Sequence, residues 1–215
     1  MTKPLGLLMA AFDISGCPEE EFNDWYDTEH VPDREKVPGF LTLTRWVAVD
    51  NPEVALAIYD LQSIDVLQSA QYLPIGYRNP SPWTRRLMPM CQRVLRFVGE
   101  QITPGNVISP RDAGGLLFMG FNLEPGAEED YAHWMDEEHL PNLSKVPGVI
   151  SARRFIGTEG TLKYIAVYHM TSPEVCASPE WLKARETPWT HRMRPRTRER
   201  LRLTCRPYRR ERPIP

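Results

Sequence analysis

The stretch Glu21-Phe-Asn-Asp-Trp-Tyr-Asp-Thr-Glu-His-Val-Pro32 returns later in the chain as Asp130-Tyr-Ala-His-Trp-Met-Asp-Glu-Glu-His-Leu-Pro141, at an offset of 109 residues. The same offset superimposes Lys36-Val-Pro-Gly39 on Lys145-Val-Pro-Gly148. Further on, Pro82-Trp-Thr-Arg-Arg86 matches Pro188-Trp-Thr-His-Arg192 at an offset of 106, so the first copy holds three extra residues, within 77–81. Chance does not align this many Trp, His, Pro and Gly positions. The 215-residue chain is therefore predicted to contain two copies of one unit.

Each copy follows the order strand, helix, strand, strand, helix, strand. In the first copy, apolar runs predict strands over 5–14, 41–49, 55–61 and 92–98, and a second helix is predicted over 64–72. Phe22, Trp25 and Glu29 recur at helical spacing, so they share one face of the first helix. That helix is expected to end before Pro32, because a residue that precedes proline avoids the α region. Val37-Pro-Gly-Phe40 has the pattern of a type II turn.

The order βαββαβ is that of the ferredoxin-like unit, an α+β fold. Helices cover one face of such a sheet and leave the other face bare, so two sheets can bury their bare faces against each other. We therefore predict a ferredoxin-like lobe over 1–101, a linker over 102–113 that is rich in turn-forming residues, and a second lobe over 114–215. Together the lobes are expected to form one barrel-like core within the chain.

The composition narrows the class of protein. A formal net charge of -2 gives no overall attraction to nucleic acid or to membrane surfaces, and no apolar run approaches the ~20 residues that span a bilayer. The apolar start of the chain is not interpreted as a signal peptide, because its counterpart at 115–121 lies inside the chain. The four cysteines form no Cys-x-x-Cys pair, which favours a reducing, cytoplasmic location.

Glu29 and Glu138 are the sharpest candidates for a functional site. Each lies on the helix face that should pack against the sheet, where a carboxylate is costly unless it is paired or protonated. The expected partners are Arg45 and Arg154, which share strand parity with apolar neighbours. The pair could hold a substrate anion, or it could be a structural ion pair between helix and sheet.

His30 and His139 follow these glutamates directly. Each is expected in the last helical turn, where the helix dipole would raise the pKa of the imidazole. A histidine beside a cavity could act as general acid or base, oriented by the glutamate. The alternative is a histidine that caps the helix by bonding a terminal carbonyl.

Aromatic side chains could line an apolar pocket for a flat substrate, although core packing is the simpler explanation for most of them. The candidates for substrate binding are Trp25, Tyr26, Tyr59, Trp83, Trp134, Tyr168, Trp189 and His169. Of these, Trp83 and Trp189 follow a proline in a polar stretch and could close the mouth of a cavity or the interface between the two halves. The two copies differ, since Met135 replaces Tyr26 and His169 replaces Asp60.

No metal site is predicted, because one Glu and one His in succession point in different directions around a helix. His139, His169 and His191 have no ligand spacing in the sequence, so only the fold could bring them together around a metal ion. The arginine-rich end, from Arg192 to Arg212, alternates with apolar residues at Leu201, Leu203 and Cys205. This pattern predicts a strand with one apolar and one cationic face, which is either solvated or binds an anion.

The repeated motif, from Phe22 through Val37-Pro-Gly to Arg45, resembles that of the dimeric α/β-barrel superfamily, and its EthD-like group in particular. The resemblance covers nearly the whole chain, once per repeat, and is more specific for fold than for activity. Members are usually homodimers of one unit, so this chain is expected to be a monomeric pseudo-dimer or a homodimer of it. Family activities include cofactor-independent monooxygenases, cyclases, isomerases, decarboxylases and heme enzymes.

The sequence therefore favours an enzyme without a cofactor that carries out proton-transfer chemistry, as an isomerase, cyclase or lyase. Its expected partner is a small, ionisable molecule that is aromatic or polyketide-like, and neither nucleic acid nor a membrane. In this hypothesis His30 or His139 transfers the proton, and Glu29 or Glu138 orients that histidine. Arg45 or Arg154 holds an anionic group of the substrate. The alternatives are a non-catalytic ligand-binding or accessory protein and a heme-dependent oxidase.

Overall fold

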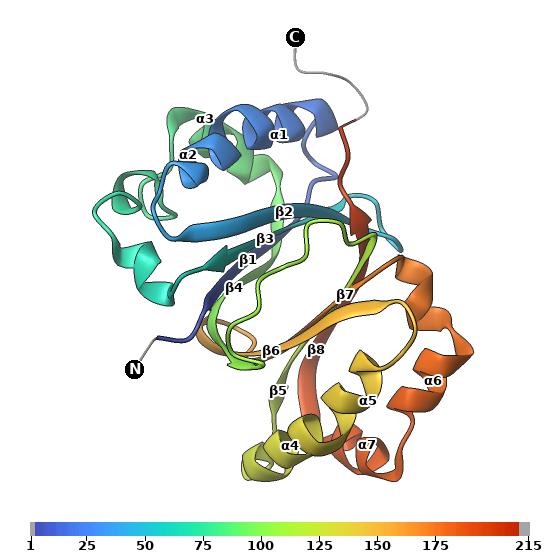
Figure 1. Ribbon diagram of the computed structural model, residues 1–215. Helices are drawn as coiled ribbons and strands as arrows, with labels where there is room; N and C mark the ends of the chain where they lie inside the picture. The colour runs from blue at the N-terminus through green and yellow to red at the C-terminus, as the bar shows by residue number, and fades with distance from the viewer. Residues whose placement is uncertain (1–2, 211–215) are drawn as a thin grey trace.

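Eight strands pair without an open edge in the computed structural model, which describes residues 3–210 (Figure 1). Their order around the closed barrel is β1-β3-β2-β8-β5-β7-β6-β4, and every pairing is antiparallel. The strands are β1 Gly6–Asp13, β2 Phe40–Ala48, β3 Val54–Leu61, β4 Gln92–Thr103, β5 Gly115–Leu123, β6 Val149–Gly160, β7 Tyr164–Met170 and β8 Thr197–Pro207. The extreme ends of the predicted lobes, 1–2 and 211–215, lie outside the described residues.

Each half of the chain contributes one four-stranded sheet. The first half gives β4-β1-β3-β2 and the second gives β8-β5-β7-β6, the same order in both. The sheets join edge to edge, where β2 pairs with β8 and β4 pairs with β6. The predicted α+β barrel of two ferredoxin-like units is thus confirmed, and the chain needs no second copy to close it. No helix in the described range is long and apolar enough to cross a membrane.

The helices lie outside the barrel, those of the first half on one side and those of the second half on the other (Figure 1). The first half contains α1 Glu19–Trp25, η1 Tyr26–His30, α2 Val31–Glu35, η2 Ile64–Gln68, η3 Leu73–Ile75, α3 Pro82–Leu87 and η4 Met88–Met90. The second half contains α4 Glu128–Trp134, η5 Met135–His139, α5 Leu140–Ser144, η6 Pro173–Ala177, α6 Pro179–Arg185, α7 Pro188–Met193 and η7 Arg194–Arg196. Three apolar clusters result: one inside the barrel and one between each sheet and its helices.

The first helix does not end before proline, which corrects the sequence prediction. In both halves it passes through one π-helical turn, η1 and η5, and continues into α2 and α5. The Val31 amide bonds the Tyr26 carbonyl five residues back, and Leu140 bonds Met135 in the same way. Proline lacks an amide donor and clashes with the carbonyl four residues earlier. The wider π turn removes both problems, so the helix survives the proline.

The predicted second helix over 64–72 is also wrong, because that segment forms only the 3₁₀ turn η2. The helix that packs on the sheet is α3, which starts at Pro82. The Ser81 side chain accepts a hydrogen bond from the Thr84 amide and so caps its first turn, whereas η2 has no such side-chain cap. The predicted type II turn is present, with Gly39 at φ 98°.

Candidate functional site

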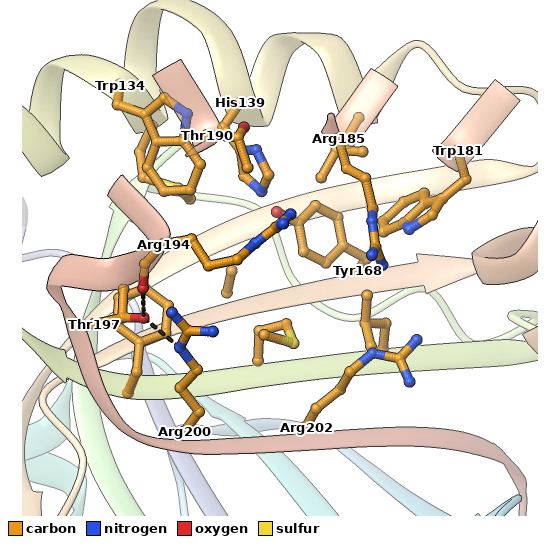
Figure 2. Close-up of a pocket in the computed structure, with 16 residues that line it drawn as sticks. Trp134, His139, Tyr168, Trp181, Arg185, Thr190, Arg194, Thr197, Arg200 and Arg202 are labelled. Atoms are coloured by element: carbon orange, nitrogen blue, oxygen red, sulfur yellow. Dashed lines mark hydrogen bonds between the residues drawn. The ribbon is translucent and has the colours of Figure 1, made fainter. Parts of the chain in front are cut away.

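Each half of the molecule holds a cavity between the outer face of its sheet and its helices. The lobe 2 cavity measures about 330 Å³, and the lobe 1 cavity about 390 Å³. Sixteen residues line the lobe 2 cavity: Leu117, Met119, Phe121, Trp134, Met135, His139, Leu143, Ala166, Tyr168, Trp181, Arg185, Thr190, Arg194, Thr197, Arg200 and Arg202 (Figure 2). Both volumes fit a small organic ligand.

His139 ends the π turn of the second half and reaches into the lobe 2 cavity. Its ring packs on Trp134 at 4.1 Å between centroids, and its enclosed Nδ1 has no hydrogen-bond partner within the described chain. Burial, reinforced by Arg194 and Arg185 and opposed by Glu186, lowers the pKa of His139 to about 4. The sequence analysis expected a raised pKa from a helix end. That expectation is wrong, because the helix continues past the histidine and burial dominates.

His30 occupies the equivalent position in the lobe 1 cavity. Its ring lies 4.3 Å from that of Trp25 and 4.8 Å from that of Tyr26. Burial first, and then Arg34 and Arg45, lower the pKa of His30 well below its ordinary value. Both motif histidines are therefore uncharged at neutral pH, so a ring nitrogen is free to accept a proton, while the lowered pKa makes each a weaker base.

Four arginines surround the lobe 2 cavity, and we call Arg185, Arg194, Arg200 and Arg202 the arginine set. Figure 2 shows Arg200 and Arg202 projecting from the strand on one side of the cavity, opposite His139 and Thr190, which project from the helices. A β-bulge in β8 sets Glu199 and Arg200 opposite Phe121, with Glu199 at φ 51°. Leu201 and Leu203 thus face the barrel interior, while Arg202 lines the cavity on the other face.

The arginine set is only partly neutralised. Glu186 pairs with Arg185 at 2.9 Å and with Arg194 at 2.7 Å. Within residues 3–210, no carboxylate pairs with Arg200 or Arg202; Arg200 donates instead to the Thr197 hydroxyl. The arrangement leaves a surplus of positive charge beside an apolar floor, which suits an anionic group on a flat ligand.

Tyr168 and Trp181 form the apolar floor of the lobe 2 cavity. Their rings meet edge to face at 5.3 Å, and both side chains are almost fully buried. Burial, with Tyr131 next in importance, raises the pKa of Tyr168, so its phenol stays protonated. Tyr168 was a predicted substrate-binding residue, and it lines the cavity.

The predicted pairing of Glu29 with Arg45 is wrong. The Ser81 hydroxyl and the Trp25 indole both donate to Glu29, the latter at 3.2 Å. In the second half, the Thr187 hydroxyl donates to Glu138 at 2.5 Å. Ser81 and Thr187 are the N-caps of α3 and α7, so each glutamate fastens the first helix to the cap of the second. Neither glutamate lines a cavity.

Arg45 and Arg154 pair with aspartates of the same motif instead. Arg45 bonds Asp27 at 2.6 Å and lies between the Tyr26 and Tyr208 rings, at 4.4 and 3.9 Å from their centroids. Arg154 bonds Asp136 at 3.0 Å. Neither arginine lines a cavity, so in the described structure they connect helix to strand.

The remaining predicted residues divide between cavity and scaffold. Trp25, Tyr26 and Tyr59 line the lobe 1 cavity, and Trp134 lines the lobe 2 cavity. Trp83 and Trp189 close no cavity mouth, because their indoles bond Glu21 at 2.6 Å and Asp130 at 3.0 Å in the first turns of α1 and α4.

His169 faces the barrel interior rather than a cavity, so it does not meet His139. Its Nδ1 lies 3.3 Å from the Ser151 hydroxyl. Burial and Arg153, opposed by Asp60, lower the pKa of His169 to about 3. Among the described residues, no group of three His, Cys, Asp or Glu side chains could hold a metal ion.

The sequence analysis missed most of the arginine set and Trp181. The signal for Arg200 and Arg202 was present, since the alternation of arginine with Leu201 and Leu203 predicted a strand with a cationic face. The sequence pattern alone could not predict that this cationic face lies against helices and so lines a cavity. Trp181 and Arg185 lie on α6, a helix in a stretch where the repeat carries no aligned motif.

Comparison with known proteins identifies the fold and no closer relationship. No family model matches the chain, and neither does any curated protein. A Fusobacterium nucleatum protein provisionally named a monooxygenase is 7% identical, with a TM-score of 0.64 over 97% of this chain and 94% of that one. An anthrone oxidase-like protein is 16% identical, with a TM-score of 0.65 over 96% and 92%. A provisionally named chlorite dismutase is 10% identical, with a TM-score of 0.66 over 96% and 95%. The chain therefore has the dimeric α/β-barrel fold.

Proposed function

We propose that the lobe 2 cavity is the active site of a cofactor-independent enzyme that removes a proton from a small, flat, acidic substrate. The observation that carries this proposal is an uncharged His139 in a 330 Å³ cavity together with four arginines. The substrate class is aromatic or polyketide-like, with a carboxylate or another anionic oxygen. We also propose that the chain is closest to the EthD-like group, on the motif described above.

His139 is the proposed base. Because Nδ1 is enclosed, Nε2 is the nitrogen that would accept the proton. It removes a proton from a carbon next to a carbonyl, and the electron pair of the C–H bond moves onto the carbonyl oxygen as an enolate. Arg200 and Arg202 stabilise the negative charge as cations placed beside the reacting oxygen.

The enolate then completes the reaction without an outside reagent. His139 returns the proton to a different carbon in an isomerisation. In a cyclisation the enolate carbon attacks a second carbonyl of the same molecule, and the resulting alkoxide takes the proton. In either case no atom is gained or lost, and the histidine ends as it began.

An oxidase is the second candidate, favoured by the fold likeness to an anthrone oxidase-like protein. It shares the first step. The carbanion then reacts with molecular oxygen, so that a CH2 group and O2 become a carbonyl group and water. Oxygen consumption separates this outcome from isomerisation or cyclisation.

A heme-dependent oxidase and a non-catalytic ligand-binding protein are the remaining alternatives. Heme iron needs an axial ligand, and His139 is the only histidine that lines the lobe 2 cavity in the described chain. Its ring is packed against Trp134, which does not favour that role. Visible absorbance of the purified protein tests for heme, and the exchange assay below tests for catalysis.

The deciding experiment measures proton removal itself. The protein is incubated in D2O with aryl ketones that carry an acidic C–H, each as the carboxylate and as its methyl ester, and loss of the C–H signal is followed by NMR. We expect exchange to be faster for the carboxylates by about tenfold or more, since charge-assisted hydrogen bonds to arginine are lost in the ester.

The His139→Gln variant should slow exchange by about 10²- to 10⁴-fold, the usual contribution of a positioned base. His30→Gln is the matched control and should exchange at the wild-type rate. Exchange that persists unchanged in His139→Gln would exclude this histidine as the base.

A further inference from the structure

The lobe 1 cavity is larger than the proposed active site and is lined differently. Trp25, Tyr26, Tyr59 and Tyr72 lie around His30, and four arginines also line the cavity. These side chains come from the first helix (α1 and η1), β3 and the segment before η3, so three separate parts of the lobe build the cavity. The proposed reaction does not use it.

One buried polar group in the lobe 1 cavity, the Tyr59 hydroxyl, is poorly satisfied within residues 3–210. The Tyr59 side chain is 1% exposed, and its hydroxyl makes no hydrogen bond of normal geometry, although the Tyr26 phenol lies close enough to influence its pKa. The Tyr59 ring lies 6.4 Å from that of His30, whose imidazole is uncharged for the reasons given above. A buried hydroxyl without a partner is costly, and a ligand that bonds it recovers that cost.

Each arginine that lines the lobe 1 cavity bonds another group of the protein. Arg34 donates to the carbonyls of His30 and Ile75, each at 3.1 Å. Arg96 pairs with Glu159 at 2.7 Å. Arg85 donates to the Pro80 carbonyl at 3.0 Å.

Tyr77 covers two arginines of this cavity, and it lies in the segment 77–81, within which the first copy carries three extra residues. Its hydroxyl accepts a hydrogen bond from Arg93 at 2.9 Å. Its ring lies 4.7 Å from the Arg93 guanidinium and 5.0 Å from that of Arg96. Tyr77 thus occupies a donor of Arg93 and covers both guanidinium groups, which leaves them less available to an anionic occupant.

We propose that the lobe 1 cavity is a second ligand site, which takes a neutral, flat, hydroxylated aromatic molecule. The ligand hydroxyl accepts a hydrogen bond from Tyr59 and donates one to His30, while the ring packs among the aromatic side chains. The two lobes thus bind different chemical classes: an uncharged phenol in lobe 1 and an organic anion in lobe 2.

Calorimetric titration with 2-naphthol tests the site, with two pairs of matched variants. Ala10 and Met119 are equivalent positions that line the lobe 1 and lobe 2 cavities respectively. Ala10→Trp should abolish 2-naphthol binding, and Met119→Trp should leave it unchanged. Tyr59→Phe should weaken binding roughly two- to tenfold, the worth of one hydrogen bond, and Tyr168→Phe should not.

Saturating 2-naphthoate should leave 2-naphthol binding in place, because the anion is expected in lobe 2. Tyr59→Phe changes one atom, so it keeps the test valid if Ala10→Trp does not fold. The proposal is overturned if wild-type protein does not bind 2-naphthol, if Tyr59→Phe binds it as tightly as wild type, or if the Met119→Trp or Tyr168→Phe variant loses it. Loss of proton exchange in lobe 2 would leave this site unaffected.

Discussion

Three histidines illustrate how burial sets the charge of a single side chain. His169 is fully buried, His30 and His139 are largely enclosed, and each has a lowered pKa. The sequence predicted a raised pKa for the motif histidines. The proline that follows indicated a helix C-terminus, whose negative dipole favours a protonated imidazole. The desolvation of an imidazolium is the larger effect.

His169 gives a prediction of pH-dependent stability. Its pKa is about 3 in the folded protein, against about 6.5 in an unfolded chain. Between these values the unfolded state binds more protons, so stability is complete above about pH 6.5 and falls as the pH drops toward 3. In this window each pH unit costs about 1.4 kcal/mol for one such histidine.

The measurement is urea unfolding of wild type and His169→Gln between pH 4.5 and pH 7. On acidification the free energy of unfolding of His169→Gln should fall less steeply than that of wild type. The difference in slope should be about 1.4 kcal/mol per pH unit, the contribution of one proton. His191→Gln, at an exposed position of α7, is the surface control. Equal slopes in wild type and His169→Gln would show that His169 does not carry this dependence.

At the scale of elements, the motif glutamate connects two helices. Thr187 caps α7 and donates to Glu138, which lies on η5. Glu138→Ala removes the acceptor and should lower the free energy of unfolding by about 1.5–3 kcal/mol, the usual range for a hydrogen bond to a charged group. Glu138→Gln keeps an acceptor oxygen and should lose less.

Neither Glu138 variant should slow proton exchange by more than about twofold, since the residue does not line the cavity. Urea unfolding and the exchange assay check the two halves of this prediction. A large loss of exchange in Glu138→Gln at unchanged stability would instead support the orienting role that the sequence suggested.

Strands and turns could be predicted from sequence, whereas the course of the first helix could not. Alternation of apolar residues located all four strands of the first half, and Val37-Pro-Gly identified its turn. A helical wheel at constant pitch placed Glu29 opposite Arg45. The π turn at η1 inserts one extra residue, which changes the face presented after Tyr26, and Asp27 meets Arg45 instead. Hydrophobic periodicity carries no signal for such a turn.

At the scale of the whole molecule, the repeat predicted the barrel but not the buried polar contacts in its interior. Near one end, Arg153 of β6 bonds Asp60 of β3 at 2.5 Å, and both side chains are 0% exposed. The equivalent positions in the other half are Thr44 and His169, so the pair has no symmetric copy. Sequence could not reveal it, because the partners lie 93 residues apart and in different lobes.

The linker completes this interior network. The Ser109 amide and the Thr42 hydroxyl both donate to Asp60, at 2.7 and 2.5 Å, and Arg153 donates to the Ser109 hydroxyl and the Val107 carbonyl. Burial raises the pKa of Asp60, but Arg153, Ser109 and Thr42 together hold it below its ordinary value. The two lobes and the linker are thereby joined through one buried carboxylate.

Breaking this pair should destabilise the whole barrel rather than one lobe. Arg153→Met leaves Asp60 buried without its cation, and Asp60→Leu does the reverse, so each should cost about 3–5 kcal/mol. The double variant leaves neither charge unpaired, and its loss should be well below the sum of the single losses. Urea unfolding of the four proteins, followed by tryptophan fluorescence and circular dichroism, measures the coupling. If the stability losses of the two single variants add up in the double variant, or if the wild type unfolds in two transitions, then the Arg153–Asp60 pair does not couple the two lobes.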